Sequence, residues 1–144
     1  MSHTSIPTKP LTIAALALCV VSLTGCSALS DTLHDEVTGH AETRADLTSA
    51  PEWMPSDATD ITSVTGTGAE DASAAPKTIV FTSPAGVATD GCDTVPRKSA
   101  PVMTVPGAPD VYAADTVVRC GDWSLAATGH RWVAWTPNTG DGAS

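Results

Sequence analysis

Prolines are concentrated in the middle of the chain and limit the structures it can adopt there. Residues 84–109 include Pro96, Pro101, Pro106 and Pro109 and show no sustained apolar period of helix or strand. Proline lacks an amide proton and clashes with the preceding helical turn, so it interrupts helices and is restricted to the edges of sheets. This stretch is therefore predicted to be a long loop, and long loops on a rigid frame often carry binding surfaces.

Runs with the character of β-strands lie on both sides of this loop. The clearest is residues 76–83, in which Ile79 and Phe81 would point to one side of a sheet. An earlier run, residues 60–67, is predicted to pair with it in the antiparallel sense. Further strand-like runs are residues 111–120 and 123–135, separated by a turn at Gly121-Asp122. The sequence predicts a small β-rich or α+β domain with about five antiparallel strands.

The first 25 residues have the plan of an export signal. Residues 1–10 carry Lys9 and no acidic side chain, and residues 11–23 are apolar apart from Thr12 and Ser22. The apolar run is too short for a stable transmembrane helix, which needs about 20 residues. Residues 1–25 are therefore predicted to be a signal peptide that is removed.

The end of this signal, Leu23-Thr24-Gly25-Cys26, resembles the lipobox of bacterial lipoproteins. In that family the cysteine sulfur carries a diacylglyceryl group and the cysteine becomes the first residue of the mature chain. The resemblance implies that Cys26 fastens the protein to the extracytoplasmic side of a cell membrane. Two acyl chains give stable attachment to a membrane, whereas one chain binds only reversibly. The alternative is an ordinary secretory signal with an incidental cysteine.

Residues 26–50 are polar and acidic and are predicted to form a flexible tether between the membrane and the folded domain. Apolar residues recur there at every fourth position, which would place a fraying helix in part of the tether: Leu29, Leu33, Val37, Ala41 and Ala45. Gly39 interrupts this pattern. His34 and His40 are spaced for neither a helix face nor a strand face, so no metal site is predicted from them.

The segment "PEWMPSDATDI", which begins at Pro51, resembles the opening of the folded part in many small actinobacterial lipoproteins. The resemblance implies a domain boundary and no activity. Trp53 is predicted to pack this entry segment onto the sheet. The folded domain is expected over residues 51–137, followed by a flexible tail, 138–144.

Cys92 and Cys120 are the cysteines that remain once Cys26 is lipidated and Cys19 leaves with the signal. An even pair in an exported chain favours a disulfide, which would pin the proline-rich loop to the sheet. A zinc or thiol-redox site is the alternative, but the pair forms no CxxC motif and has no histidine cluster nearby.

The charge balance excludes some partners. The chain has a formal net charge of −9, which argues against nucleic acid and against electrostatic binding to anionic lipid. Motifs for nucleotide, calcium or catalytic zinc binding are missing from the sequence, so neither a cofactor nor a metal is predicted.

Catalytic patterns are also missing. The sequence has no GxSxG, and His130 is the one histidine within the predicted domain. Carboxylates for glycoside cleavage could come from several turn positions, but nothing selects a pair: Asp90, Asp93, Asp110, Asp115 and Asp122. The chain is predicted to be a non-catalytic binding or accessory module of the envelope. An envelope hydrolase directed at glycan or peptide, and a secreted inhibitor or sensor accessory, stay open as alternatives.

Two registers are open for the C-terminal hairpin. A three-residue loop at Thr128-Gly129-His130 would place Trp123 opposite Trp135 and leave Trp132 on the other face. A two-residue turn would move Trp132 toward the core side. The three-residue loop is favoured because it pairs large apolar groups.

An outward Trp132 beside Arg131 and His130 would suit a sugar ring or a protein partner of the envelope. The alternative is that a helix or the proline-rich loop covers Trp132. Arg97 and Lys98, an adjacent basic pair in an acidic chain, could receive an anionic group, or they are simply solvated. These five residues form the predicted binding surface.

Overall fold

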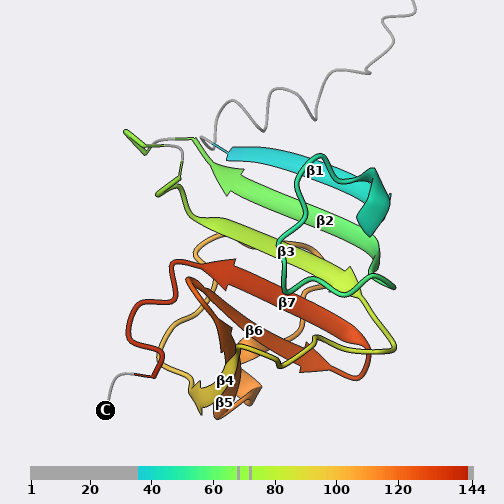
Figure 1. Ribbon diagram of the computed structural model, residues 1–144. Helices are drawn as coiled ribbons and strands as arrows, with labels where there is room; N and C mark the ends of the chain where they lie inside the picture. The colour runs from blue at the N-terminus through green and yellow to red at the C-terminus, as the bar shows by residue number, and fades with distance from the viewer. Residues whose placement is uncertain (1–35, 68, 72, 143–144) are drawn as a thin grey trace, which may run out of the picture.

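The computed structural model describes residues 36–67, 69–71 and 73–142, which form one antiparallel sheet (Figure 1). The strands are β1 (Glu36–Thr43), β2 (Thr59–Gly66), β3 (Lys77–Thr82), β4 (Asp93–Pro96), β5 (Thr116–Cys120), β6 (Trp123–Thr128) and β7 (Arg131–Thr136). Two short 3-10 helices, η1 (Arg44–Asp46) and η2 (Val111–Ala113), lie between strands. The order across the sheet is β1-β2-β3-β7-β6-β5-β4. The β-rich class is confirmed, with seven strands where about five were predicted.

β1 begins the described part of the chain and belongs to the sheet. It pairs with β2 along its length, with Glu36 opposite Gly66 and Thr43 opposite Thr59. At Gly39 the two strands lie so close that a Cβ atom would come 2.8 Å from the Ser63 hydroxyl oxygen, so the glycine that argued against a helix serves strand pairing. The predicted tether and its helix are therefore wrong for residues 36–50. Leu29, Leu33 and His34 lie outside the described residues.

β3 confirms the clearest sequence prediction and occupies the middle of the sheet between β2 and β7. Val80 and Phe81 are both fully buried although they point to opposite sides. Since successive side chains of a strand alternate between faces, both faces of the sheet must be covered.

The β6–β7 hairpin has the two-residue turn. Thr128 lies opposite Arg131 and Ala127 opposite Trp132, so the favoured three-residue loop is wrong. Gly129 has φ +61°, and glycine at the first central position is the requirement of a type II′ turn, whose twist matches that of the strands. Turn geometry therefore determined the register. It places Trp132 on the same face as Trp123 and places Trp135 on the other face.

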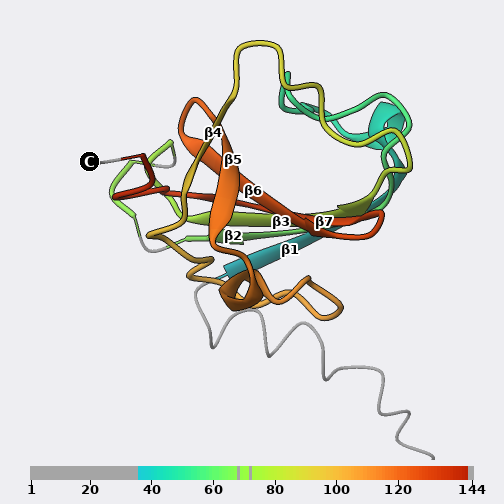
Figure 2. The ribbon, with the colours of Figure 1, turned by 90° about the horizontal axis from the view of Figure 1, so that it is seen from below.

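The two faces carry different cores. The face that we call the aromatic face is covered by residues 44–58 and by the loop 83–92, and the proline face by residues 97–115; Figure 2 shows η2 on the opposite side of the sheet from the loop 83–92. The aromatic face buries Ile61, Ile79, Phe81, Leu125 and Ala134, with Trp53, Trp123 and Trp132 packed against them. The proline face buries Val64, Val80, Val105, Val111, Val117, Ala126, Val133 and Trp135.

The C-terminal segment packs on the sheet instead of forming a tail. Asp141 is only 6% exposed and accepts hydrogen bonds from residues of two other segments. The predicted flexible tail is thus wrong for residues 138–142, because a buried carboxylate with protein donors holds the segment in place. Residues 143 and 144 are outside the described range.

Candidate binding site

A hollow of about 390 Å³ lies on the proline face, between β3 and residues 101–112 of the covering loop. Its wall is mostly apolar and includes Pro101, Met103, Val105, Pro106, Pro109 and Val111. Small-molecule sites in proteins are typically about 300–1,000 Å³ and mainly apolar, with a few polar groups. The size and lining of this hollow are those of a small ligand site.

The covering loop forms the hollow because it is fixed at two points and arched between them. Val105 and Val111 insert into the core of the proline face and are 2% and 5% exposed. Between them Gly107 has φ +74°, and the amide of Ala108 donates to the carbonyl of Val105 at 3.1 Å. Prolines in this stretch prevent a regular helix or strand from closing the space.

Two apolar side chains stand exposed on the same loop. Val102 is 70% exposed and Tyr112 is 72% exposed. The Arg97 guanidinium lies 5.3 Å from the centre of the Tyr112 ring, and Arg97 Nε donates to the carbonyl of Ala114 at 2.9 Å. Tyr112 lines the hollow, so its ring is an exposed but supported part of the site.

Thr78 of β3 contributes to the hollow from the sheet. It is 1% exposed, and its hydroxyl oxygen has no hydrogen-bond partner among the described residues. Across the strands it lies opposite Val64 and Trp135. The indole N–H of Trp135 is already used, because it donates to the Ser99 hydroxyl at 2.7 Å. An unpaired buried polar group is costly, and among the described residues Arg44 Nε and the indole N–H groups of Trp53 and Trp132 are in the same state.

Asp141 forms a polar clasp that holds the start of the covering loop. Its carboxylate accepts hydrogen bonds from the amides of Lys98 and Ser99 and from the hydroxyls of Ser99 and Ser124. Burial would raise the pKa of Asp141, but the hydrogen bonds from Ser124, Ser99 and Lys98 outweigh it and hold the pKa below its ordinary value. Because this carboxylate is surrounded by donors, its role is structural.

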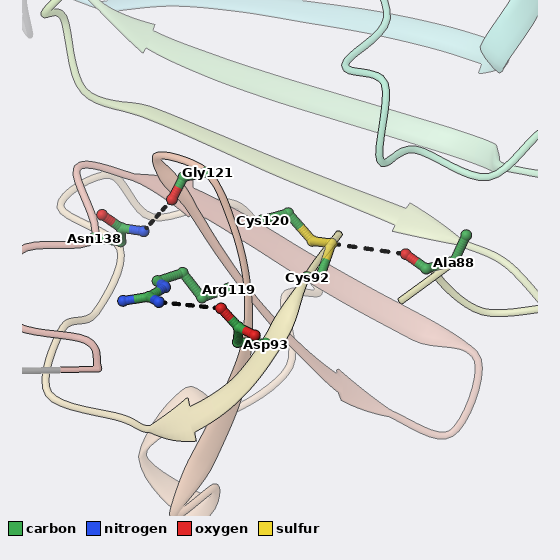
Figure 3. Close-up of a disulfide and its surroundings, with 7 residues drawn as sticks. All are labelled: Ala88, Cys92, Asp93, Arg119, Cys120, Gly121 and Asn138. Carbon is green, nitrogen blue, oxygen red and sulfur yellow. Dashed lines mark hydrogen bonds and ion pairs between the residues drawn. A yellow bond between two sulfur atoms is a disulfide. The ribbon is translucent and has the colours of Figure 1, made fainter. Parts of the chain in front are cut away.

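The disulfide joins Cys92 to Cys120 with an S–S distance of 2.02 Å, which confirms the predicted pair (Figure 3). It ties the end of the loop 83–92 to the end of β5 on the aromatic face. Beside it, Arg119 and Asp93 form an ion pair at 3.2 Å, and the Asn138 amide donates to the carbonyl of Gly121 at 3.0 Å. The disulfide thus holds the loop 83–92 against the aromatic face of the sheet.

The predicted binding surface does not form one exposed patch. Trp132 stacks on Phe81, with ring centres 6.3 Å apart and an angle of 11° between the planes. A Cβ atom at Gly86 would lie 3.4 Å from the Trp132 ring, so the first part of the predicted loop 84–109 covers the indole. Trp132 is therefore part of the aromatic face, as the alternative reading held.

The remaining residues of that surface have other partners. Arg131 pairs with the carboxylate of Asp60 at 2.6 Å and bonds the Thr82 hydroxyl at 3.0 Å. His130 is exposed in its turn, and its carbonyl accepts the amide of Ser83 at 2.9 Å. Arg97 and Lys98 lie at the start of the covering loop, where Arg97 supports Tyr112 and the Lys98 amide binds Asp141.

Trp53 packs the entry segment onto the aromatic face, as predicted. Its ring centre lies 6.0 Å from that of Phe81 and 5.3 Å from that of Trp123. The second contact has an angle of 60° between the rings, an edge-to-face arrangement that aromatic pairs favour.

Of the acidic side chains considered for catalysis, Asp93 and Asp122 line one open hollow with Asp141, whereas Asp110 lines the hollow of the proline face. Asp93 is held by Arg119, and Asp110 accepts the amide of Tyr112 at 3.0 Å to cap η2. Asp57, which the sequence did not single out, accepts the Ser83 hydroxyl and the Ala85 amide, and these bonds lower the pKa of Asp57. Over the described ranges no group of three or more His, Cys, Asp or Glu residues could hold a metal ion.

The residues of the hollow were only partly visible in the sequence. The proline-rich loop was named as a position for a binding surface, but Thr78 and Tyr112 were not. A threonine between Lys77 and Ile79 is an ordinary strand residue in the sequence, and the burial of its side chain depends on the loop that covers it.

Comparisons with family models, with curated proteins and with solved structures found no match to this chain. Among the residues that the structure describes, no helix is long and apolar enough to span a bilayer.

Proposed function

We propose that this protein is a lipid-anchored module of the cell envelope that binds a ligand, without catalysis, in the hollow of the proline face. The observation that supports this most directly is the hollow itself, which has an apolar wall and the exposed side chain of Tyr112 at its side. Neighbouring acidic groups serve the fold, so binding is favoured over hydrolysis.

The anchor in this proposal is the diacylglyceryl group on Cys26. Because β1 begins at Glu36, the segment between the lipid and the sheet has about ten residues and reaches at most roughly 35 Å. The acidic charge of the chain would not attract it to anionic lipid, so attachment would depend on the acyl chains.

The anchor is tested by replacing Cys26 with alanine in the full chain, with Cys19→Ala as the matched control. We expect Cys26→Ala to leave the membrane fraction and Cys19→Ala to stay there. Mass spectrometry of the mature amino terminus should find acylated Cys26. An unmodified chain that begins elsewhere would contradict the proposal.

The binding role is tested with Nile red, an uncharged dye that fluoresces in apolar sites. We expect Tyr112→Ala combined with Val102→Ser to reduce its fluorescence severalfold without a change in the urea midpoint, because both side chains are exposed. Ala88→Ser is the control, since Ala88 is exposed in the loop 83–92, which covers the opposite face of the sheet. Equal dye binding by all three proteins would contradict a site at the hollow.

A further inference from the structure

We infer that the outer edge of β1 binds an extended segment of another protein in which basic and apolar side chains alternate. This interaction surface lies apart from the hollow of the proline face and goes beyond the binding function proposed for that hollow. Three properties of the described residues support it: the open edge of β1, the separation of acidic and apolar side chains along that edge, and a hollow beside its end.

β1 offers an unpaired edge of the sheet. It is the last strand at one end, and β2 is its one partner strand among the described residues (Figure 1). Natural proteins commonly protect such edges by making the strand short or by placing proline or lysine on it. β4, at the other end, has four residues and ends at Pro96. β1 has eight residues and contains neither proline nor lysine, so a further strand can pair with it.

The side chains of β1 are divided by chemistry between the two sides of the edge. Ala41 lies opposite Ile61 of the aromatic face, and Thr38 lies opposite Val64 of the proline face. Because side chains alternate along a strand, the aromatic side of the edge carries Val37, Gly39 and Ala41, and the proline side carries Glu36, Thr38, His40 and Glu42. Val37 is 58% exposed. An added strand therefore meets apolar groups on one side and carboxylates on the other.

The charges at this edge favour a basic partner. Glu36 and Glu42 form no ion pair within the described residues. Arg44 follows the strand directly and has a buried Nε, and Lys77 lies two strands inward on the aromatic side. His40 lies within hydrogen-bond distance of a threonine hydroxyl of β2. Opposite charges on neighbouring strands stabilise the pairing, so lysine or arginine is favoured on the proline side of an added strand.

A second copy of this chain is a poor occupant of the edge. Antiparallel pairing of two β1 strands about Gly39 would place Glu36 of each copy opposite Glu42 of the other. Like charges that lie directly opposite each other destabilise a sheet, and each copy has a formal net charge of −9. The same charge would attract a basic segment and speed its association.

A hollow of about 380 Å³ lies at the end of β1, where its pairing with β2 is interrupted. The β1–β2 ladder skips Glu42 and Asp60, and Asp60 has φ +49°. Irregularities of this kind recur at sheet edges, where they redirect side chains. Both acidic residues line the hollow, but Arg131 pairs with Asp60 at 2.6 Å, so Glu42 supplies the uncompensated charge. The hollow can therefore take a basic side chain that lies next to Glu42 on an added strand.

The test uses three peptides: the alternating acetyl-KVKVTVK-amide, its acidic counterpart acetyl-EVEVTVE-amide, and the reordered acetyl-KKKTVVV-amide. Binding to the folded chain is followed by NMR shifts of the amides of residues 36–43. We expect the alternating basic peptide to bind roughly tenfold more tightly than either of the others, because it meets carboxylates at two cross-strand positions. Its affinity should fall severalfold between about 0.05 and 0.5 M salt.

Two sets of changes assign the binding to this edge. N-methylation of alternate peptide residues should abolish binding in one phase and keep it in the other, because only every second N–H of an added strand faces β1. Glu36→Gln combined with Glu42→Gln should remove the preference for the basic peptide. Glu52→Gln combined with Asp90→Asn makes the same change of charge at exposed positions beside the disulfide and should keep the preference.

The dye experiment tests the hollow of the proline face separately, so failure of the peptide experiment leaves the proposed function intact. Absence of binding by the basic peptide, equal affinity for the basic and acidic peptides, or binding in both N-methylated phases would overturn the inference. Shifts of residues 36–43 that grow with protein concentration in the absence of peptide would also overturn it, because they would identify a second copy as the occupant.

Discussion

The two faces of the sheet are covered by different means. On the aromatic face, Trp53, Trp123 and Trp132 pack with Phe81, and the Cys92–Cys120 disulfide closes the cover. On the proline face, the covering loop is fixed by Val105 and Val111 and by the hydrogen bonds to Asp141. The aromatic face is sealed by large rings and a covalent bond, whereas the proline face is held at separate points.

The difference explains where a ligand can enter. Large rings interdigitate between the loop and the sheet, and the hollow that lies beside the disulfide on this face, also of about 390 Å³, is bordered by the acidic side chains Glu52 and Asp90. A loop that is held at separate points and kept irregular by proline leaves gaps between those points. The hollow beside Thr78 lies in such a gap. Stability and binding are thus assigned to opposite faces of one sheet, and this division can be tested by mutation.

The largest effect is expected on the aromatic face. Phe81 is fully buried between Trp53 and Trp132, so Phe81→Ala should lower the free energy of unfolding by about 4 kcal/mol through lost burial and a cavity. Urea denaturation measures the change, with the exposed Val37→Ala as the control. A loss below about 1 kcal/mol would show that the rings do not form the stabilising core of this face.

Loss of the disulfide should be nearly as costly. In the chain-entropy model, the closed loop between Cys92 and Cys120, which are 28 positions apart, contributes roughly 3.5 kcal/mol. The double variant Cys92→Ser and Cys120→Ser is compared with the oxidised wild type by thermal denaturation. Nile red binding at the hollow should persist in the folded double variant, because the bridge closes the opposite face. If the hollow lost the dye while the domain stayed folded, the two faces would not be independent.

On the proline face, the clasp at Asp141 should matter somewhat less. Asp141→Asn replaces an accepting oxygen by an amide donor that faces other donors, and we expect a loss of about 2–3 kcal/mol. Asp90→Asn is the matched control, because Asp90 is exposed. Unlike the disulfide variant, Asp141→Asn should also weaken dye binding, since the clasp positions the start of the covering loop.

The same variant has a pH dependence of known sign. The pKa of Asp141 in the folded protein is lower than its ordinary value of 3.8, so the carboxylate stabilises the fold above that value. As pH falls through the folded pKa, the carboxylate is protonated and this stabilisation is lost. The difference in unfolding free energy between wild type and Asp141→Asn should be constant from about pH 7 to 5 and should shrink below pH 3.8. A difference that grew in acid would contradict this sign.

The sequence predicted those parts of the fold that depend on local chemistry. Alternation in residues 76–83 identified β3, the turn at Gly121-Asp122 was correct, and the cysteine count gave the disulfide pair. Trp53 was correctly assigned to packing, but the predicted domain boundary at residue 51 was wrong, because residues 51–58 lie between β1 and β2 of one sheet. Each of these signals is contained in a few neighbouring residues.

Features that depend on distant partners were not predictable in the same way. β1 has a weak strand signal of its own and is a strand because β2 offers an edge to pair with. Asp141 looked like part of a polar tail, since its four donors come from residues more than 15 positions away. Thr78 has an unpaired hydroxyl only because the proline-rich loop crosses above it. These are tertiary effects, and single-sequence patterns do not record them.

The smallest predicted effect tests the turn that sets which face of the sheet each tryptophan of β7 occupies. Gly129 has a positive φ that a residue with a Cβ atom adopts only with strain, so Gly129→Ala should cost about 1 kcal/mol. His130→Ala in the same turn is the control and should have little effect, because His130 is exposed. Both changes are measured by urea denaturation. Ala127 lies opposite Trp132, and a slip to a three-residue loop would place it opposite Arg131, so Trp132 and Trp135 would exchange faces. Near-UV circular dichroism therefore reports the register independently of stability. If the spectrum is unchanged while the free energy of unfolding falls by about 1 kcal/mol, the β6–β7 register is kept despite the strain at residue 129. The register is then fixed by the packed strands as well as by the turn.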